Sequence, residues 1–370
     1  MRDQAISGLV SLASREDWLA SAQGPSIVAA LEEAATDANA VVRMHAARAL
    51  PTLWRHLEVP EQVRRLEEWL AREPEPGVVQ QLLMVLHPLA ATAPSEVDEL
   101  LRRSAVRGTD PGDTTDRDVK AVRDLEVGIL TYLALAKQTP YATDRLDAWA
   151  REAHLLDEPR QVVRHIRNYL RPSNAGTQQR AFEFATSTAT TCVAHFDRIV
   201  AQHDGEKTLP AELSEQLKRI HTTLDRIASQ VYFASGAYND KAQGRTAEVS
   251  AENERLAQLA IPLLIACSQT HAAPIVHHVA ETLVYLSPLD QRRALLALSQ
   301  VINPAGAYAS DNFGSSVVVP HLKTLLADHR HLVLFDPDGV VAFRQLLTSF
   351  AAAGSEPALE LVFTFAEVFR

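Results

Sequence analysis

Apolar side chains recur every three or four residues along almost the whole chain, and alternation with a period of two is nearly absent. The first spacing is typical of one face of an α-helix, and the second of a half-buried β-strand. Helices are expected in pairs separated by short breaks, first at 27–34 and 41–53, then at 61–71 and 78–90. The pattern predicts an all-α protein in which each helix buries one face against its neighbours.

These helix pairs follow one another with a period of about 40 residues. A third pair is expected at 97–107 and 119–137, and a similar pair at 256–267 and 274–286. Repeats of this length with two helices each are the signature of an α-solenoid, in which stacked repeats share one continuous core.

Segment 27–53 has a distinctive order of residues around the break between its two helices. The residues concerned are Asp37 after the first helix, Val42 and Arg43 at the start of the second, and then Ala46, Ala47, Arg48, Ala49 and Leu50. In this respect the segment resembles a HEAT repeat, and the resemblance extends over about residues 25–92. It implies an α-α superhelix, that is, a HEAT-like, armadillo-type solenoid.

The middle of the chain carries longer apolar seams. In 182–203 and 213–231 the apolar residues are spaced alternately by three and four, the a/d pattern of helices that pack along their length. We therefore expect a long antiparallel hairpin at 173–236, between N-terminal repeats at 1–172 and C-terminal repeats at 248–370. The alternative is an overlong repeat packed inside the stack.

Two polar stretches rich in small residues, 235–251 and 303–316, are expected to be loops. The last predicted helix, 357–369, is apolar on most sides, and the first, 3–20, starts abruptly. Because the end units of a solenoid need a polar outer face, we expect the chain to belong to a longer, multidomain protein or to dock its ends on a partner.

The composition excludes several classes of protein but does not indicate a particular function. The net charge of −10 argues against non-specific nucleic-acid binding, although it does not exclude a local basic groove. Two cysteines exclude a disulfide framework, and no apolar run reaches the length of a membrane span. The N-terminus does not resemble a signal peptide, so we expect a cytoplasmic protein, and the abundance of arginine and alanine is typical of a bacterial one.

Common catalytic and cofactor motifs are absent from the sequence. His271, His277, His278 and Glu281 lie close together in the sequence and suggest a metal site, but solvated or capping histidines are the favoured interpretation. The acidic stretch 110–118 lacks the pattern of a calcium-binding loop. The cysteines and tryptophans occupy apolar helix positions, where core packing is expected. No catalytic residue, cofactor or metal is predicted.

Arginine is concentrated at 43–72 and 160–171. Within the second stretch the spacing is four, three and four, which places the arginines on one helix face, opposite an apolar face. Such a stripe can bind carboxylates or phosphates through paired hydrogen bonds, although a solvated face is the commoner case. The candidate binding residues are Arg160, Arg164, Arg167, Arg171, Arg43 and Arg48.

The architecture favours a non-catalytic scaffold or recognition module that binds a protein or peptide partner, because solenoids present extended surfaces. The alternative is a nucleic-acid-binding HEAT-like protein similar to the alkylation-repair glycosylases, which requires the arginines to converge on one groove. A third hypothesis, an enzyme that uses the C-terminal histidines, depends on the metal site discussed above.

Overall fold

The computed structural model describes residues 2–55, 57–106, 117–171, 174–203, 209–241, 244–302 and 312–364. Within these ranges all regular structure is helical and no strand is present, as the apolar periodicity predicts. The chain forms two compact units, unit 1 (Met1–Leu146) and unit 2 (Asp147–Arg370). The division expected from the sequence, at residues 172 and 236, stays a prediction.

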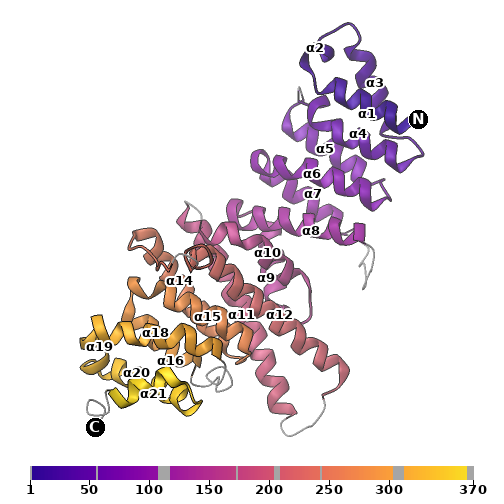
Figure 1. The fold of residues 1–370 in the computed structure, drawn as a ribbon. Coiled ribbons are helices and arrows are strands. Elements are labelled where there is room, and N and C mark those ends of the chain that lie inside the picture. Colours follow the sequence, from indigo (N-terminus) through magenta and orange to yellow (C-terminus); the bar gives the residue numbers. More distant parts are fainter. Residues whose placement is uncertain are drawn as a thin grey trace. The chain divides into compact units, whose positions relative to one another are not determined.

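Unit 1 is a stack of helix pairs (Figure 1). It contains α1 (Arg2–Ala13), α2 (Glu16–Leu19), α3 (Gly24–Ala34), α4 (Ala40–Leu53), α5 (Val59–Leu70), α6 (Pro76–Thr92), α7 (Pro94–Val106), α8 (Arg117–Tyr132), a π-helical turn (Leu133–Lys137) and the start of α9 (Pro140–Arg151). Helices α1, α4, α6 and α8 pack side by side in one layer, and α5 packs beside α7 in the other. Most of the acidic stretch 110–118 lies outside the described residues.

Unit 2 continues the same plan with longer helices. After the end of α9 come α10 (Glu158–Leu170), α11 (Ala175–Gln202), α12 (Ala211–Ser235), α13 (Ala237–Lys241), α14 (Ala251–Ser268), α15 (Ala273–Leu286), a 3₁₀ turn (Ser287–Leu289), α16 (Gln291–Ile302), α18 (Asn312–Asp328), α19 (Arg330–Leu334), α20 (Pro337–Ala352) and α21 (Glu356–Thr364). One layer holds α11, α14, α16 and α20, and the other holds α10, α12, α15, α18 and α21. Within each unit, paired helices in two layers confirm the predicted all-α fold, an α-α solenoid.

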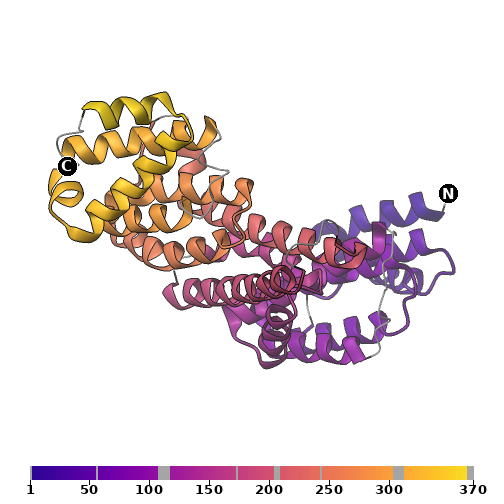
Figure 2. The same ribbon diagram turned by 90° about the horizontal axis from the view of Figure 1, so that it is seen from below.

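The predicted hairpin is present as α11 and α12, which extend in magenta to red in both views (Figures 1 and 2). Its seam is buried, with Phe182, Ala185 and Cys192 on α11 facing the core together with Ile220 and Leu224 on α12. Both arms also pack against neighbours in their own layers, α11 on α14 and α12 on α10 and α15. The hairpin is therefore also an overlong repeat of the stack.

Some local predictions need correction. Of the expected loop at 303–316, residues 303–311 lie outside the described ranges, and the rest belong to α18, which begins at Asn312. The expected loop at 235–251 contains the short helix α13. The serine and glycine at the start of α18 favour a loop, but burial of Val318, Val319 and Leu322 along one helix face outweighs that preference. No described helix is long and apolar enough to cross a membrane.

Candidate functional site

The predicted arginine stripe lies on the solvent side of α10, in the layer that α10 shares with α12 and α15. Val162, Val163 and Ile166 are buried on the opposite side of this helix. Arg164 and Arg167 are exposed and Arg160 is half-buried, so the spacing in the sequence places the apolar and basic faces correctly.

A further arginine, Arg226 of α12, belongs to this surface. It is half-buried, and within the described residues its side chain has no hydrogen bond or ion pair. Burial and the neighbouring positive charges of Arg160 and Arg164 lower the pKa of Arg226 from its ordinary value. Partial burial and two neighbouring like charges are unfavourable for a guanidinium group. A bound anion would offset both effects, so these surroundings favour an anion at Arg226.

Two carboxylates lie among these arginines. Oδ1 of Asp157 is 3.2 Å from Nη2 of Arg160 and 3.5 Å from Nε of Arg219, so two guanidinium groups share one oxygen. Nη1 of Arg219 donates a hydrogen bond to the carbonyl oxygen of Leu155 at 2.6 Å. Asp225 is drawn toward α15, where Nδ1 of His278 lies 3.3 Å from its Oδ1.

We call this set the arginine cluster. It consists of Arg160 and Arg164 on α10, Arg219 and Arg226 on α12, and the carboxylates Asp157 and Asp225. Within this set four guanidinium groups lie near two carboxylates, and such a local concentration of arginine attracts anionic groups.

The other two arginines of the stripe have different surroundings. The guanidinium of Arg167 lies 5.0 Å from the centroid of the Phe233 ring on α12, a cation–π contact. Arg171 donates hydrogen bonds to Glu252 at 2.7 Å and to Asn253 at 2.6 Å, and its Nη1 reaches the carbonyl oxygen of Ser235 at 3.3 Å. Arg171 therefore joins the end of α10 to α12 and α14, and its donors are occupied within the fold.

The two candidates of the early repeats, Arg43 and Arg48, lie on α4 of unit 1. Arg43 donates to both carboxylate oxygens of Glu73, at 2.9 and 2.7 Å, and to the carbonyl oxygens of Asp37 and Ala38. Arg48 is exposed and donates to Gln81 at 3.1 Å. Arg43 thus connects successive helix pairs, and neither residue belongs to the arginine cluster.

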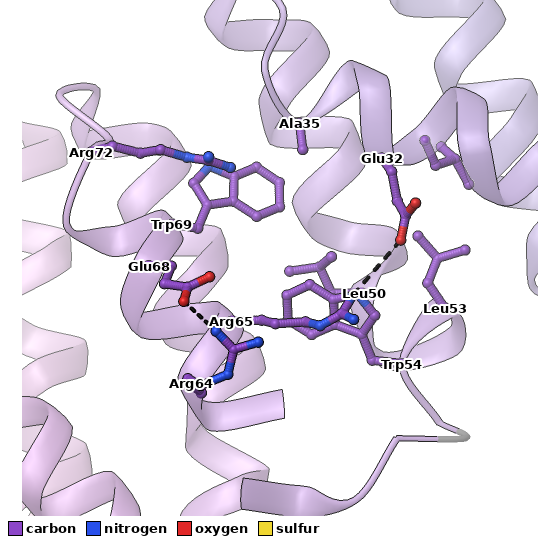
Figure 3. A pocket seen from close by; sticks show the side chains of 11 residues that line it. Glu32, Ala35, Leu50, Leu53, Trp54, Arg64, Arg65, Glu68, Trp69 and Arg72 are labelled. Atoms are coloured by element: carbon purple, nitrogen blue, oxygen red, sulfur yellow. Dashed lines mark hydrogen bonds and ion pairs between the residues drawn. The ribbon is translucent and has the colours of Figure 1, made fainter. Parts of the chain in front are cut away.

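Unit 1 contains a pocket of about 270 Å³ between α3, α4 and α5 (Figure 3). Its apolar wall is formed by Leu31, Ala35, Leu50, Leu53, Trp54 and Trp69, and its polar rim by Glu32, Arg64, Arg65, Glu68 and Arg72. Sequence analysis missed this pocket because apolar periodicity marks buried faces and not the gaps between them. It also missed Arg219 and Arg226, although their spacing of seven residues places them on one face of α12.

The structure also places the other candidate residues of the sequence, the histidines and cysteines of unit 2. In the described part of the chain, no three histidine, cysteine, aspartate or glutamate side chains gather as a metal site would require. Nε2 of His277 lies 3.4 Å from Oε1 of Glu281. Cys192 and Cys267 are buried, and burial raises the pKa of both thiols, that of Cys192 to about 12, which makes them poor nucleophiles at neutral pH.

Comparison with known protein-family models and with curated proteins finds no match. Among solved structures, the chain is similar to "Crystal structure of Kap121p", with 15% identity and a TM-score of 0.40. It is also similar to "Crystal structure of Kap121p bound to Nup53p", with 14% identity and a TM-score of 0.37. Each match covers 92% of this chain, and the chain spans 39% of the length of each matched protein.

Proposed function

We propose that this protein is a non-catalytic recognition module that binds an acidic segment of a partner protein at the arginine cluster. The observation that carries this proposal is Arg226, a half-buried guanidinium group with no hydrogen bond or ion pair among the described residues. Burial and the charges of Arg160 and Arg164 on the facing helix lower its pKa, and the opposing effect of Asp225 and Asp157 is smaller. A cytoplasmic location remains part of the proposal.

A bound carboxylate would interact with these groups in two ways. It would reduce the repulsion among Arg160, Arg164 and Arg226, and it would accept hydrogen bonds from the planar donors of a guanidinium group. A hydrogen bond between the carboxylate and a guanidinium group would contribute about 1.5–3 kcal/mol to the binding free energy. Because α10 and α12 pack along their length, the groups that bind are already placed before the ligand arrives.

A protein ligand fits this surface better than a nucleic acid does. Asp157 and Asp225 lie within the cluster and divide its positive charge, so the arginines do not form the continuous basic track that a row of phosphates needs. The next helix of the layer, α15, has no arginine or lysine and carries Glu281. A nucleic acid gains its affinity from many phosphate contacts along a basic track, whereas the arginine cluster draws its positive charge from α10 and α12 alone.

Fluorescence anisotropy with two labelled probes tests the proposal. One probe is a short polyglutamate peptide and the other is a DNA duplex of equal charge. We expect the protein to bind the peptide more tightly than the duplex. Replacing Arg160 and Arg164 together by alanine should weaken peptide binding by tenfold or more, about the loss expected for one charge-assisted hydrogen bond.

The matched control is Arg255→Ala, because Arg255 is an exposed arginine on α14, in the other layer of unit 2. This variant should bind the peptide as the wild type does. Tighter binding of the duplex would overturn the proposal in favour of the nucleic-acid hypothesis. Equal peptide affinity of the double variant and the wild type would show that the cluster is not the binding site.

A further inference from the structure

The pocket of unit 1 has a fixed aromatic wall. Nε1 of Trp69 donates a hydrogen bond to Oε2 of Glu73 at 3.3 Å, and Arg43 holds the same carboxylate from the other side. The indole of Trp69 is therefore anchored at its polar edge. Figure 3 shows its ring and that of Trp54 directed toward the same hollow from two sides.

The rim of the pocket carries charges that are mostly paired. Arg64 binds Glu61 and Glu68, and Arg65 binds Glu61 at 2.8 Å. The Arg65 guanidinium lies 3.8 Å from Glu32 and 5.9 Å from the centroid of a Trp54 ring, so it covers part of the apolar wall. These contacts keep the arginine-rich rim in place over the indoles.

Arg72 differs from the other two arginines of the rim. Across the described ranges, its exposed side chain has no hydrogen bond or ion pair. It lies three residues after Trp69, and Figure 3 shows it extending along the indole of that residue. The mouth of the pocket therefore has a positive charge that no described residue neutralises.

We infer that this pocket takes one apolar side chain of a partner peptide, and that a carboxylate next to that side chain pairs with Arg72. The volume of about 270 Å³ lies just below the range of about 300–1,000 Å³ typical of small-molecule sites, which suits a single anchoring side chain. Aromatic-walled pockets that receive one such side chain often dominate the affinity of a peptide interface. The inference is independent of the proposed function, since none of its residues belongs to the arginine cluster.

Two small probes test the inference separately from any natural partner. N-acetyl-phenylalanine carries an apolar ring and a carboxylate, and N-acetyl-phenylalanine amide carries the same ring without the charge. NMR of ¹⁵N-labelled full-length protein follows the four indole N–H signals during titration. We expect the signals of Trp54 and Trp69 to shift, and the signal of Trp149, which is buried in unit 2, to stay unchanged.

The acid should bind about threefold more tightly than the amide, within the usual strength of an exposed ion pair. In Arg72→Ala this preference should disappear, and in the control Arg48→Ala it should persist. Ala35→Leu fills the pocket from the end of α3 and should abolish binding of both probes. Thermal unfolding of each variant shows whether it is folded.

Absence of any shift of the Trp54 and Trp69 signals would overturn the inference. Equal affinities for acid and amide in the wild type, or an unchanged preference in Arg72→Ala, would overturn the pairing with Arg72. Failure here leaves the arginine cluster unaffected, because the polyglutamate measurement uses variants in unit 2 alone.

Discussion

Arg43 and Glu73 form a two-pronged ion pair that joins two successive helix pairs of unit 1. Arg43 lies on α4, Glu73 lies between α5 and α6, and their side chains are only 12% and 2% exposed. Burial raises the pKa of Glu73, but hydrogen bonds from Arg43 and from the backbone of Glu75 outweigh it, so the pKa lies below its ordinary value. Arg43, which the sequence indicates as a binding residue, therefore stabilises the fold by this ion pair.

Replacing Arg43 by alanine should destabilise unit 1 by about 3 kcal/mol, because it leaves the Glu73 carboxylate buried without its main partner. Urea denaturation, with hydrogen exchange of the α4 amides as the local probe, measures the loss. The control Arg48→Ala removes one exposed hydrogen bond and should change stability by less than about 0.5 kcal/mol. Equal stability losses in the two variants would contradict this role of Arg43.

Asp157 competes with any acidic ligand of the arginine cluster, because it already occupies donors of Arg160 and Arg219. Asp157→Asn removes the competing charge while keeping the shape of the side chain. Its side chain makes no capping hydrogen bond to α10, so the helix should be little affected. We expect this variant to bind polyglutamate about threefold more tightly than the wild type does, as measured by fluorescence anisotropy. The size of the effect is that of an exposed ion pair. Weaker binding would show that Asp157 helps to hold the ligand.

His321 makes the stability of unit 2 dependent on pH. Its side chain is 9% exposed, and its Nε2 atom has no hydrogen-bond partner among the described residues. Burial together with the nearby charge of His329 lowers its pKa to about 4. The unfolded chain, with an ordinary histidine pKa of about 6.5, therefore binds a proton more readily than the folded one. Above about pH 6.5, His321 is neutral in both states and the free energy of unfolding is at its full value. As the pH falls toward 4, the unfolded chain gains a proton that the folded protein does not, and the free energy of unfolding decreases.

At about pH 5 the expected loss from this one group is about 2 kcal/mol relative to neutral pH. Urea denaturation at both pH values, monitored on α18, measures it. His321→Leu removes the titrating group, so the stability difference between the two pH values should shrink by that amount. An unchanged pH dependence in this variant would assign the effect to other groups.

Much of the fold is predictable from the sequence because it follows from local periodicity. The spacing of Val162, Val163 and Ile166 places the apolar face of α10 correctly, and with it the arginines on the opposite side. The start of α18 is missed because its glycine and serines favour a loop, and only the packing of residues such as Val318 makes it helical.

The candidate sites are less predictable, since each depends on which helices become neighbours. Arg160 and Arg226 are far apart in the sequence, and only the packing of α10 against α12 brings their charges together. The unit 1 pocket depends on the space left between α3, α4 and α5. Charge alone also cannot separate Arg43 and Arg171, whose donors the fold occupies, from Arg226, whose donors find no acceptor among the described residues.

The central claim is that Arg226 binds a ligand and that its charge lowers the stability of unit 2. The variant Arg226→Met tests both parts, by its urea unfolding and by its affinity for the polyglutamate probe. Methionine fills similar space without the charge, so it removes the repulsion from Arg160 and Arg164 and leaves no buried partner unpaired. The account predicts that this variant unfolds at the same or a higher urea concentration than the wild type, while its affinity for the polyglutamate probe falls about tenfold. A variant that is less stable and binds the probe as tightly as the wild type would contradict it.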